Sequence, residues 1–334
     1  MKRLILLLFL LALISVVIAG ALLNAFAHRP LETRPSHPLP FEFTVEKGAT
    51  WKGLSKKLVD EGLESDARML WLLGRITGQA GSIQAGNYRL DPGSTPLTLL
   101  QKLADGDVIP MSITFVEGIT FADMRAQLEQ SPGIKVTLKG LPVADVLARV
   151  GAVEKFPEGL FFPDTYRYAA GTTDLDLLRK SYQTQQRKLA EAWNTRAPNL
   201  PYRSPYEALI MASIIEKETG RVEDRQMIAS VFVNRLKLPM RLQTDPTVIY
   251  GLGARFDGNL RKVDLVTDTP YNTYTRDGLP PTPISLPGNA SLRAALQPAQ
   301  SDKLYFVSKG DGSSYFSKTL EEHNRAVAKY QLHR

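Results

Sequence analysis

The chain has 334 residues, of which 43% are hydrophobic and 22% are charged, which fits two or three domains with a buried core and excludes a disordered protein. Its 41 Lys and Arg exceed its 34 Asp and Glu, and the net charge of +7 favours an acidic polymer or an anionic membrane surface as partner. The basic residues are spread along the chain without a nucleic-acid-reading motif, so we expect no nucleic-acid binding. There is no cysteine and only four scattered histidines, so we expect no disulfide, metal or cofactor site.

An apolar run from Leu4 to Leu23 follows Lys2 and Arg3, interrupted only by one Ser and one Gly. Roughly 20 helical residues at ~1.5 Å each cross a hydrocarbon core of about 30 Å, so the run predicts a transmembrane helix. The positive-inside rule keeps Lys2 and Arg3 in the cytoplasm. We therefore expect residues 1–28 to form a cytoplasmic tip and a single-pass membrane anchor, with the rest of the chain outside the cytoplasm.

A cleaved signal peptide is the alternative interpretation of this segment. Ala25-Phe26-Ala27 has the small-x-small pattern of a cleavage site. The apolar run is longer than the apolar region of about 7 to 15 residues found in signal peptides, which favours a retained anchor. Residues 29–40 come next, and their four prolines among polar residues predict an extended spacer.

Beyond the spacer, a local pattern occurs three times: a short strand, a Gly, a Thr and an amphipathic helix. Each Thr is placed to cap the helix that follows, and Pro96 and Phe121 occupy first-turn positions. The glycines are typical of turns. The copies are Phe41–Val45 with Gly48 and Thr50, Tyr88–Leu90 with Gly93 and Thr95, and Ile113–Val116 with Gly118 and Thr120.

Residues 41–110 are predicted to form a small module. A second helix, from about Asp66 to Ile76, follows the first, and the strand near Tyr88 completes the order strand, helix, helix, strand. This βααβ order, with the opening Val-x-x-Gly-x-Thr sequence, resembles a LysM module, a fold that in other proteins binds the N-acetylglucosamine backbone of peptidoglycan or chitin. The resemblance leaves two roles open, which are glycan binding and mere positioning of the next domain.

Residues 111–334 are predicted to form a mixed α+β domain. Apolar residues recur with helical spacing from Asp174 to Trp193, which indicates a surface helix. Nearly every residue between Ala208 and Ile215 is apolar, so this helix should be buried on most sides. Further predicted elements are a helix at Asp224–Leu236, strands at Leu304–Val307 and Tyr315–Ser317, and a last helix opened by a capping box from Thr319 to Glu322.

Two carboxylates, Glu216 and Glu218, end the apolar helix. A carboxyl group beside apolar packing loses hydration, so its pKa rises and it becomes suited to general acid catalysis near neutral pH. The two side chains point about 200° apart, so both cannot enter one cleft in the same way. Glu218 lies over the more apolar strip of Met211, Ile214 and Ile215, which favours it. The alternative is that both are exposed charges at a helix end.

Long motifs mark the second half of the chain: MASIIEKET at Met211–Thr219, SVFVNRLKLPMRLQTDPTVIYG at Ser230–Gly251, YNTY at Tyr271–Tyr274 and GLPPTPISLPG at Gly278–Gly288. Shorter ones precede them: AGNYRL at Ala85–Leu90, VEGIT at Val116–Thr120 and EGLFFPDTYRY at Glu158–Tyr168. Together they resemble the endolytic murein transglycosylase family, also called MltG or YceG-like. The resemblance includes the single N-terminal anchor and covers essentially the whole chain.

The resemblance implies a lytic transglycosylase that cleaves the β-1,4 bond between N-acetylmuramic acid (MurNAc) and N-acetylglucosamine (GlcNAc) in peptidoglycan and leaves 1,6-anhydro-MurNAc ends. The family's catalytic residue, the second Glu of its EKET motif, falls on Glu218. Such an enzyme would cut nascent glycan strands on the periplasmic side of the inner membrane, end their elongation and have peptidoglycan synthases as partners. One carboxylate suffices because the MurNAc C6 hydroxyl attacks its own anomeric carbon, whereas hydrolysing glycosidases generally use two.

Six motif residues are predicted to line the substrate cleft, because polar and aromatic groups suit hydrogen bonds to sugar hydroxyls and stacking on sugar faces. Asp245 has a second interpretation, since Asp245, Pro246 and Gly253 fit an N-cap, a first-turn proline and a C-terminal glycine. His323, on the last helix, is interpreted as a packed or surface residue. The six candidates are Gln243, Thr244, Asp245, Tyr271, Asn272 and Tyr274.

Two other functions stay open on the sequence alone. One is a glycan-binding scaffold in which the LysM-like module acts and Glu218 only ends a helix. The other is a hydrolysing muramidase that uses Glu218 with Asp245 or Asp268 and leaves reducing ends. Release of soluble muropeptides from sacculi separates the scaffold from both enzymes, and the mass of the products, which differ by one water, separates the enzymes from each other.

Overall fold

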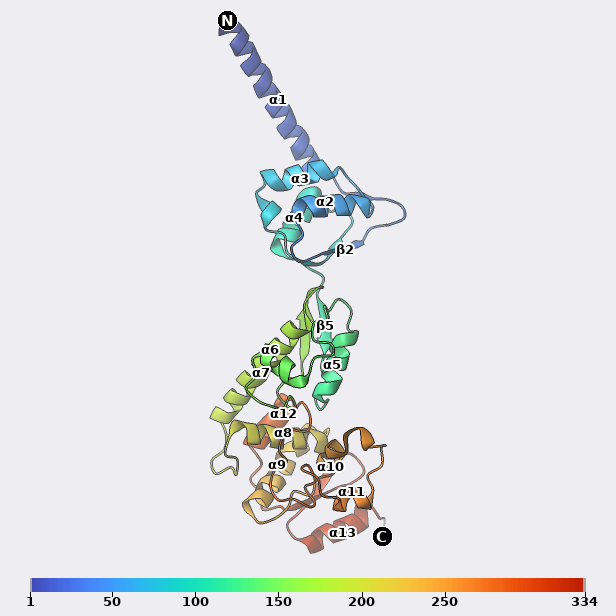
Figure 1. The fold of residues 1–334 in the computed structure, drawn as a ribbon, viewed down its shortest axis with the longest axis vertical. Helices are drawn as coiled ribbons and strands as arrows, with labels where there is room; N and C mark the ends of the chain where they lie inside the picture. Colours follow the sequence, from blue (N-terminus) through green and yellow to red (C-terminus); the bar gives the residue numbers. More distant parts are fainter. Residues whose placement is uncertain (1, 333–334) are drawn as a thin grey trace. The chain divides into compact units, whose positions relative to one another are not determined.

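The computed structural model describes residues 2–332 and confirms the mixed α+β class. Within this range the chain is mostly helical, and its strands form four two-stranded sheets (Figure 1). It divides into two compact units, which are described separately below. The N-terminal unit comprises residues 1–112, 132–135 and 167–172, and the C-terminal unit comprises residues 113–131, 136–166 and 173–334.

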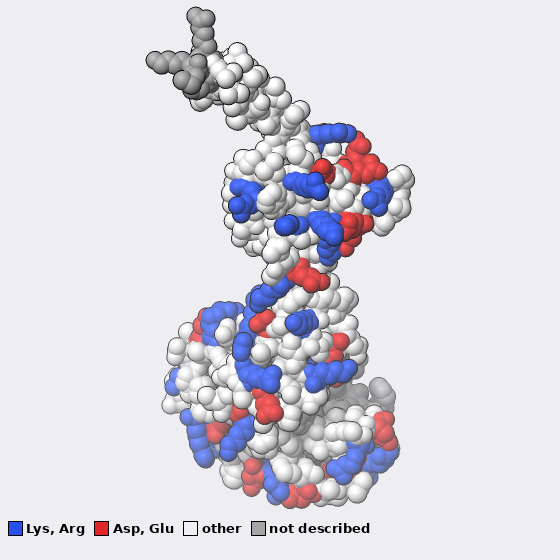
Figure 2. All heavy atoms as spheres, turned by 45° about the horizontal axis from the view of Figure 1, so that its top comes forward, with Lys and Arg blue, Asp and Glu red and all other residues white. Residues whose placement is uncertain are grey.

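The N-terminal unit begins with the apolar helix α1 (Lys2–His28). Its residues Leu6–His28 are long and apolar enough to cross a membrane, as the sequence predicts. Figure 2 shows this helix as an almost wholly white rod, because it contains no Lys, Arg, Asp or Glu after its first two residues. At its other end Ala27 is buried, and Leu23 and Phe26 pack against the hydrophobic core of the unit.

The rest of the N-terminal unit has the predicted order strand, helix, helix, strand. Strand β2 pairs antiparallel with β4 from Phe41 opposite Leu90 to Val45 opposite Gly86, and alternate residues of both strands are buried. Trp51 on α2 packs against Gly74 on α3 and donates a hydrogen bond to the Leu70 carbonyl oxygen at 2.9 Å. The elements are β2 (Phe41–Val45), α2 (Trp51–Asp60), β3 (Leu63–Glu64), α3 (Ala67–Ile76), a 3-10 turn (Gln79–Gly81), β4 (Gly86–Leu90) and α4 (Pro96–Asp105).

The proline-rich segment 29–40 was predicted to be an extended spacer, but it contains a turn in which the His37 N–H donates to the Arg34 carbonyl oxygen at 2.8 Å, and part of it packs against the unit. Its strand β1 (Glu32–Thr33) pairs antiparallel with β3. Leu31 is buried, and its backbone N–H donates to the Ser94 carbonyl oxygen at 2.7 Å. Proline content predicts an extended backbone but carries no information on burial. Burial here follows from the apolar side chain of Leu31 and from the pairing of β1 with the edge of β3.

The predicted helix caps are confirmed. The hydroxyls of Thr50, Thr95 and Thr120 each accept a hydrogen bond from the backbone N–H three residues later. The last helix, α13, is opened by the predicted capping box of Thr319 and Glu322.

The C-terminal unit is built around α8 (Pro205–Glu218), which packs against α7, α9, α10 and α12. The predicted strand at Ile113–Val116 lies two residues earlier, as β5 (Met111–Thr114), where it pairs with β6 (Thr165–Tyr168). Strands β7 (Tyr305–Ser308) and β8 (Ser314–Ser317) form an antiparallel hairpin packed against α13. The other helices are α5 (Phe121–Gln130), α6 (Val143–Val150), α7 (Asp174–Asn194), α9 (Val222–Lys237), α10 (Asp245–Leu252), α11 (Lys262–Val266), α12 (Asn289–Leu296) and α13 (Leu320–Tyr330), with a 3-10 turn at Gly253–Arg255.

Candidate active site

Helix α8 carries Glu218 as its last residue. Ser204 caps its start by accepting the Glu207 N–H, and Pro205 occupies the first turn. Every residue from Ala208 to Ile215 is buried, which confirms the predicted central helix. Glu218 is therefore held at the end of a helix whose position is fixed by packing on nearly all sides.

The proline-rich motif between Gly278 and Gly288 has a structural role against α8. The Ser213 hydroxyl accepts the Ile284 N–H at 3.0 Å, and the Ser285 hydroxyl donates to the Ser213 carbonyl oxygen at 3.1 Å. Residues 282–288 are buried. This motif therefore fixes the helix that carries Glu218.

The Glu218 carboxyl group has a raised pKa. Burial raises its pKa to about 7, and the negative charge of Asp245 adds to the rise. The hydrogen bond that the Thr244 hydroxyl donates to Glu218 Oε1 and the positive charge of Arg235 both act in the opposite direction. With this pKa, both the protonated and the ionised forms of Glu218 are populated near neutral pH, which suits a group that exchanges protons.

Thr244 is held toward Glu218 by a turn that precedes α10. The residue before it, Gln243, has a left-handed backbone with φ 49°, a conformation that residues other than glycine rarely adopt. Hydroxyls stabilise the turn from within: the Thr244 N–H donates to Thr273 Oγ1 at 3.0 Å, and the Thr247 hydroxyl donates to the Thr244 carbonyl oxygen at 2.8 Å. A strained residue over-determined by its neighbours is a feature typical of functional sites.

The N-cap interpretation of Asp245 is wrong. Asp245 is the first residue of α10, and Thr244 occupies the N-cap position, with its hydroxyl directed to Glu218 instead of to the helix. The Asp245 carboxylate instead accepts a hydrogen bond from the Tyr274 hydroxyl. Burial raises the pKa of Tyr274, and the Asp245 carboxylate raises it further, so Tyr274 stays a hydrogen-bond donor.

A cavity of about 590 Å³ brings together four of the predicted residues: Glu218, Gln243, Asp245 and Tyr274. Thr244 is buried behind them, against Glu218. The opposite wall comes from the C-terminal hairpin and α13. It comprises Tyr305, Phe306, Val307, Ser308, Ser314, Leu320, His323, Val327 and Gln331.

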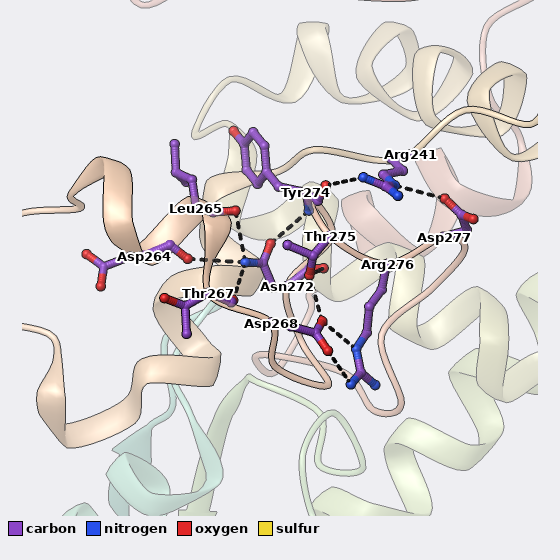
Figure 3. Close-up of polar contacts among 10 residues, drawn as sticks. All are labelled: Arg241, Asp264, Leu265, Thr267, Asp268, Asn272, Tyr274, Thr275, Arg276 and Asp277. Atoms are coloured by element: carbon purple, nitrogen blue, oxygen red, sulfur yellow. Dashed lines mark hydrogen bonds and ion pairs between the residues drawn. The ribbon is translucent and has the colours of Figure 1, made fainter.

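The structure places Asn272 and Tyr271 outside this cavity. Asn272 is buried, and its side-chain amide donates to the carbonyl oxygens of Asp264, Leu265 and Thr267 at 3.1, 3.1 and 2.7 Å (Figure 3). Its Oδ1 accepts the Tyr274 N–H at 2.8 Å, so it orients the segment that carries Tyr274. The Tyr271 hydroxyl shares a 2.8 Å hydrogen bond with the Thr282 hydroxyl.

Asp268 is also occupied elsewhere. It forms two hydrogen bonds of 2.9 Å with the Arg276 guanidinium, which lowers its pKa to about 2 (Figure 3). It does not line the cavity. Asp245 is therefore the second carboxylate that the cavity places with Glu218.

Sequence reasoning missed the other residues that line the cavity, among them Arg235, Tyr305 and His323. Arg235 is buried, donates to the carbonyl oxygens of Leu304 and Leu242 at 2.7 Å each, and lies 5.3 Å from the centre of the Tyr305 ring. His323 stacks on Tyr305, with ring centres 5.3 Å apart, and burial lowers its pKa, so it is neutral at pH 7. An arginine within the apolar VFVNRLK stretch was a usable signal for Arg235, whereas Tyr305 and His323 carry no local signal.

Glu216 and Glu218 have different environments, and neither side chain is a free charge at a helix end. Glu216 accepts from Arg225 Nη2 at 2.8 Å and from the Gly288 N–H at 2.9 Å, and both partners of the ion pair are buried. Glu117 completes the cluster at 3.7 Å from Arg225. A Cβ atom on Gly288 would lie 1.7 Å from Glu117 Oε1, so a side chain there would displace the Glu117 carboxylate. Glu216 thus faces away from the cavity, as predicted, and has a structural role.

Comparisons with known proteins agree with these motifs. The profile of the YceG-like family matches residues 43–329. A protein of Bacillus subtilis named endolytic murein transglycosylase is 37% identical over 268 residues, which cover 75% of this chain and 74% of the relative. A protein of the same name from Streptococcus pneumoniae is 29% identical over 283 residues, and the chain spans about half its length, 51%.

A solved structure resembles the chain as well. The crystal structure of a yceG-like protein from Listeria monocytogenes aligns with a TM-score of 0.51 and 32% identity, covering 85% of this chain and 98% of that one. Sequence and fold therefore lead to one family, the one that the motifs around Glu218 resemble. The chain belongs to the YceG-like family.

Proposed function

We propose that this protein is an endolytic lytic transglycosylase that cleaves the MurNAc–GlcNAc β-1,4 bond of peptidoglycan with Glu218 as its acid and base. The observation that carries the proposal is the environment of Glu218. Its carboxyl group, with a pKa of about 7, lies in a cavity of about 590 Å³ lined with polar and aromatic side chains. The relatives named endolytic murein transglycosylase support the choice of substrate.

The reaction needs one group that gives a proton and takes another back. Protonated Glu218 donates its proton to the bridging oxygen as the bond from that oxygen to the MurNAc anomeric carbon breaks. The Glu218 carboxylate then accepts the proton of the MurNAc C6 hydroxyl, whose oxygen forms the new bond to the same carbon. No water is consumed, and the product is a 1,6-anhydro end.

Neighbouring residues support both steps. The Thr244 hydroxyl binds Glu218 Oε1, which leaves Oε2 for the substrate. Arg235 stabilises the carboxylate formed after proton donation, because its positive charge acts on Glu218 from the same cavity. Gln243 and Tyr274 provide polar groups for sugar hydroxyls.

A hydrolysing muramidase is the second candidate, because Asp245 lines the same cavity as Glu218. In that mechanism Asp245 would activate water or attack the sugar. Mass spectrometry of muropeptides released from sacculi tests the choice. The transglycosylase yields 1,6-anhydro ends, and products heavier by one water would establish hydrolysis.

The expected location follows from α1. We infer that α1 is a single-pass anchor in the inner membrane, with a cytoplasmic N-terminus and the catalytic domain in the periplasm. Confinement to the membrane raises the effective concentration of the enzyme near newly made strands, so we propose that it cuts nascent strands and ends their elongation. The LysM-like module keeps its two proposed roles, glycan binding and positioning of the catalytic domain. Peptidoglycan synthases are the proposed partners, and their absence after gentle crosslinking would count against that partnership.

The anchor leads to a prediction for the mature protein. Protein purified from membranes is expected to keep its N-terminus, because the apolar run is longer than that of a signal peptide. Intact-mass measurement checks this. A mass lacking residues 1–27 would show that the segment is a cleaved signal peptide.

Asp245 leads to a prediction that separates the two mechanisms. Asp245→Asn removes a negative charge that raises the pKa of Glu218, so the alkaline limb of the kcat/KM profile should move to lower pH. Because Asp245 does not cap α10, little change in melting temperature is expected. A loss of turnover by several orders of magnitude at every pH would instead identify Asp245 as a second catalytic group.

A further inference from the structure

Helix α3 exposes an apolar face on the outside of the N-terminal unit. Its inner side is buried, with Leu70 and Leu73 in the core and Gly74 against Trp51. A surface helix ordinarily directs polar residues outward, and an exposed apolar cluster marks an interaction surface. The outer residues are Trp71, Leu72 and Ile76, with exposed fractions of 38, 37 and 64%, accompanied by exposed Arg68 and Arg75.

The position of α3 within its unit indicates what this face contacts. Helix α1 contacts both α3 and α4, and Figure 1 shows α3 on the side of the unit where α1 enters. The apolar run Leu4–Leu23 is about as long as a hydrocarbon core of roughly 30 Å. The α1 residues that pack on the unit, Leu23, Phe26 and Ala27, lie at the end of that run. Helix α3 therefore lies at the depth where the bilayer meets water.

We propose that the outer face of α3 binds the outer leaflet of the inner membrane, in the zone of lipid headgroups and first acyl carbons. The proposal rests on α1 being the membrane anchor. Trp suits this zone, because its ring is apolar and its N–H is polar. The Arg75 guanidinium lies 6.0 Å from the centre of the Trp71 ring, and arginine can extend its charge to lipid phosphates while its stem stays among apolar groups.

The structure favours lipid over a protein partner for this face. Helix α3 contacts α1, whose residues Leu6–His28 are long and apolar enough to cross a membrane, so lipid around α1 would lie next to α3. Around the base of α1, blue Lys and Arg atoms and red Asp and Glu atoms both lie on the surface (Figure 2). The N-terminal unit would then be held at the membrane by two contacts, α1 and α3, instead of swinging on a flexible tether.

The lack of cysteine allows a direct test with single labelled positions. Full-length Leu72→Cys carries an environment-sensitive fluorophore on the outer face of α3. Glu42→Cys is the matched control, because Glu42 is exposed on β2, away from α1 in Figure 1. Ile14→Cys, in the middle of α1, reports on the anchor itself. Each protein is reconstituted in vesicles of phosphatidylethanolamine and phosphatidylglycerol.

Two quenchers distinguish the outcomes: a nitroxide on the lipid near the headgroup, and iodide in the water. We expect the lipid nitroxide to quench most of the Leu72→Cys signal and iodide to quench Glu42→Cys. The double substitution Trp71→Glu and Ile76→Glu should move the Leu72→Cys label to the iodide-accessible state, with near-ultraviolet circular dichroism confirming the fold.

Iodide quenching at Leu72→Cys with protection of Ile14→Cys from iodide would overturn the α3 proposal and leave the anchor intact. Protection of Leu72→Cys from both quenchers would also overturn it, since a protein would then cover the face. Iodide quenching at Ile14→Cys would refute the anchor, and the α3 proposal with it.

Discussion

Glu218→Gln is expected to abolish glycan cleavage while leaving the fold intact. Gln keeps the shape of the side chain and can accept the Thr244 hydrogen bond, but it cannot pass a proton to the bridging oxygen. Positioned acid–base catalysis contributes about 10² to 10⁴ in rate, so kcat/KM for release of 1,6-anhydro ends should fall by at least that factor. Digestion of sacculi followed by mass spectrometry measures it.

The control for this substitution is Glu223→Gln, a chemically identical change at an exposed residue of α9. It should retain wild-type activity. If Glu218→Gln still releases 1,6-anhydro ends at near the wild-type rate, the assignment of Glu218 fails, although the family membership stands.

The raised pKa of Glu218 predicts how the activity of the wild-type protein and its stability relative to Glu218→Gln depend on pH. The free enzyme needs protonated Glu218, so wild-type kcat/KM should fall as the pH rises above about 7. The folded-state pKa lies above the ordinary value of 4.5, so ionisation of Glu218 opposes folding, and stability is lost as the pH rises through about 7. Glu218→Gln should therefore melt higher than wild type at pH 8, and this advantage should be absent at pH 4. Equal melting differences at both pH values would contradict the raised pKa.

Glu216→Gln should destabilise the protein strongly, although Glu216 does not face the cavity. Its carboxylate pairs with Arg225, and the side chains of both residues are almost fully buried, at 4 and 6% exposed. Removing one charge of a buried pair typically costs about 3–5 kcal/mol in unfolding free energy, and the half-exposed Glu117, 3.7 Å from Arg225, compensates the remaining charge only in part. Thermal or denaturant unfolding measures the loss. Glu216→Gln is therefore unsuitable as a neutral control for Glu218.

A double-mutant cycle shows whether the pair itself is responsible. Arg225→Met added to Glu216→Gln removes the unpaired guanidinium and should recover part of the lost stability. Additive losses in the double variant, or an unchanged melting temperature for Glu216→Gln, would show that the ion pair contributes little. Glycan cleavage by the folded fraction of Glu216→Gln should remain, since Glu216 does not line the cavity that contains Glu218.

Local chemistry in the sequence determined the helix caps and the buried helix that ends in Glu216 and Glu218. The caps at Thr50, Thr95 and Thr120 were predictable because each joins a side-chain oxygen to the backbone N–H three residues later. Such a contact lies within one helical turn and depends only on neighbouring residues. Helix α8 was predictable because its apolar residues leave no polar face. The family motifs then distinguished Glu218 from Glu216, which periodicity alone did only weakly.

The tertiary structure alone decided which residues share the cavity with Glu218. The Thr244 hydroxyl donates a hydrogen bond to Glu218, and the Tyr274 hydroxyl donates one to Asp245. The first of these contacts forms because the turn before α10 lies against the end of α8. His323 lies more than a hundred residues along the chain from Glu218, yet lines the same cavity. Asn272, polar and within a motif, instead holds backbone carbonyls. Such contacts depend on packing between segments that are far apart in the sequence. Hydrophobic periodicity predicts only the helix or strand to which a residue belongs, and not the residues that this element contacts.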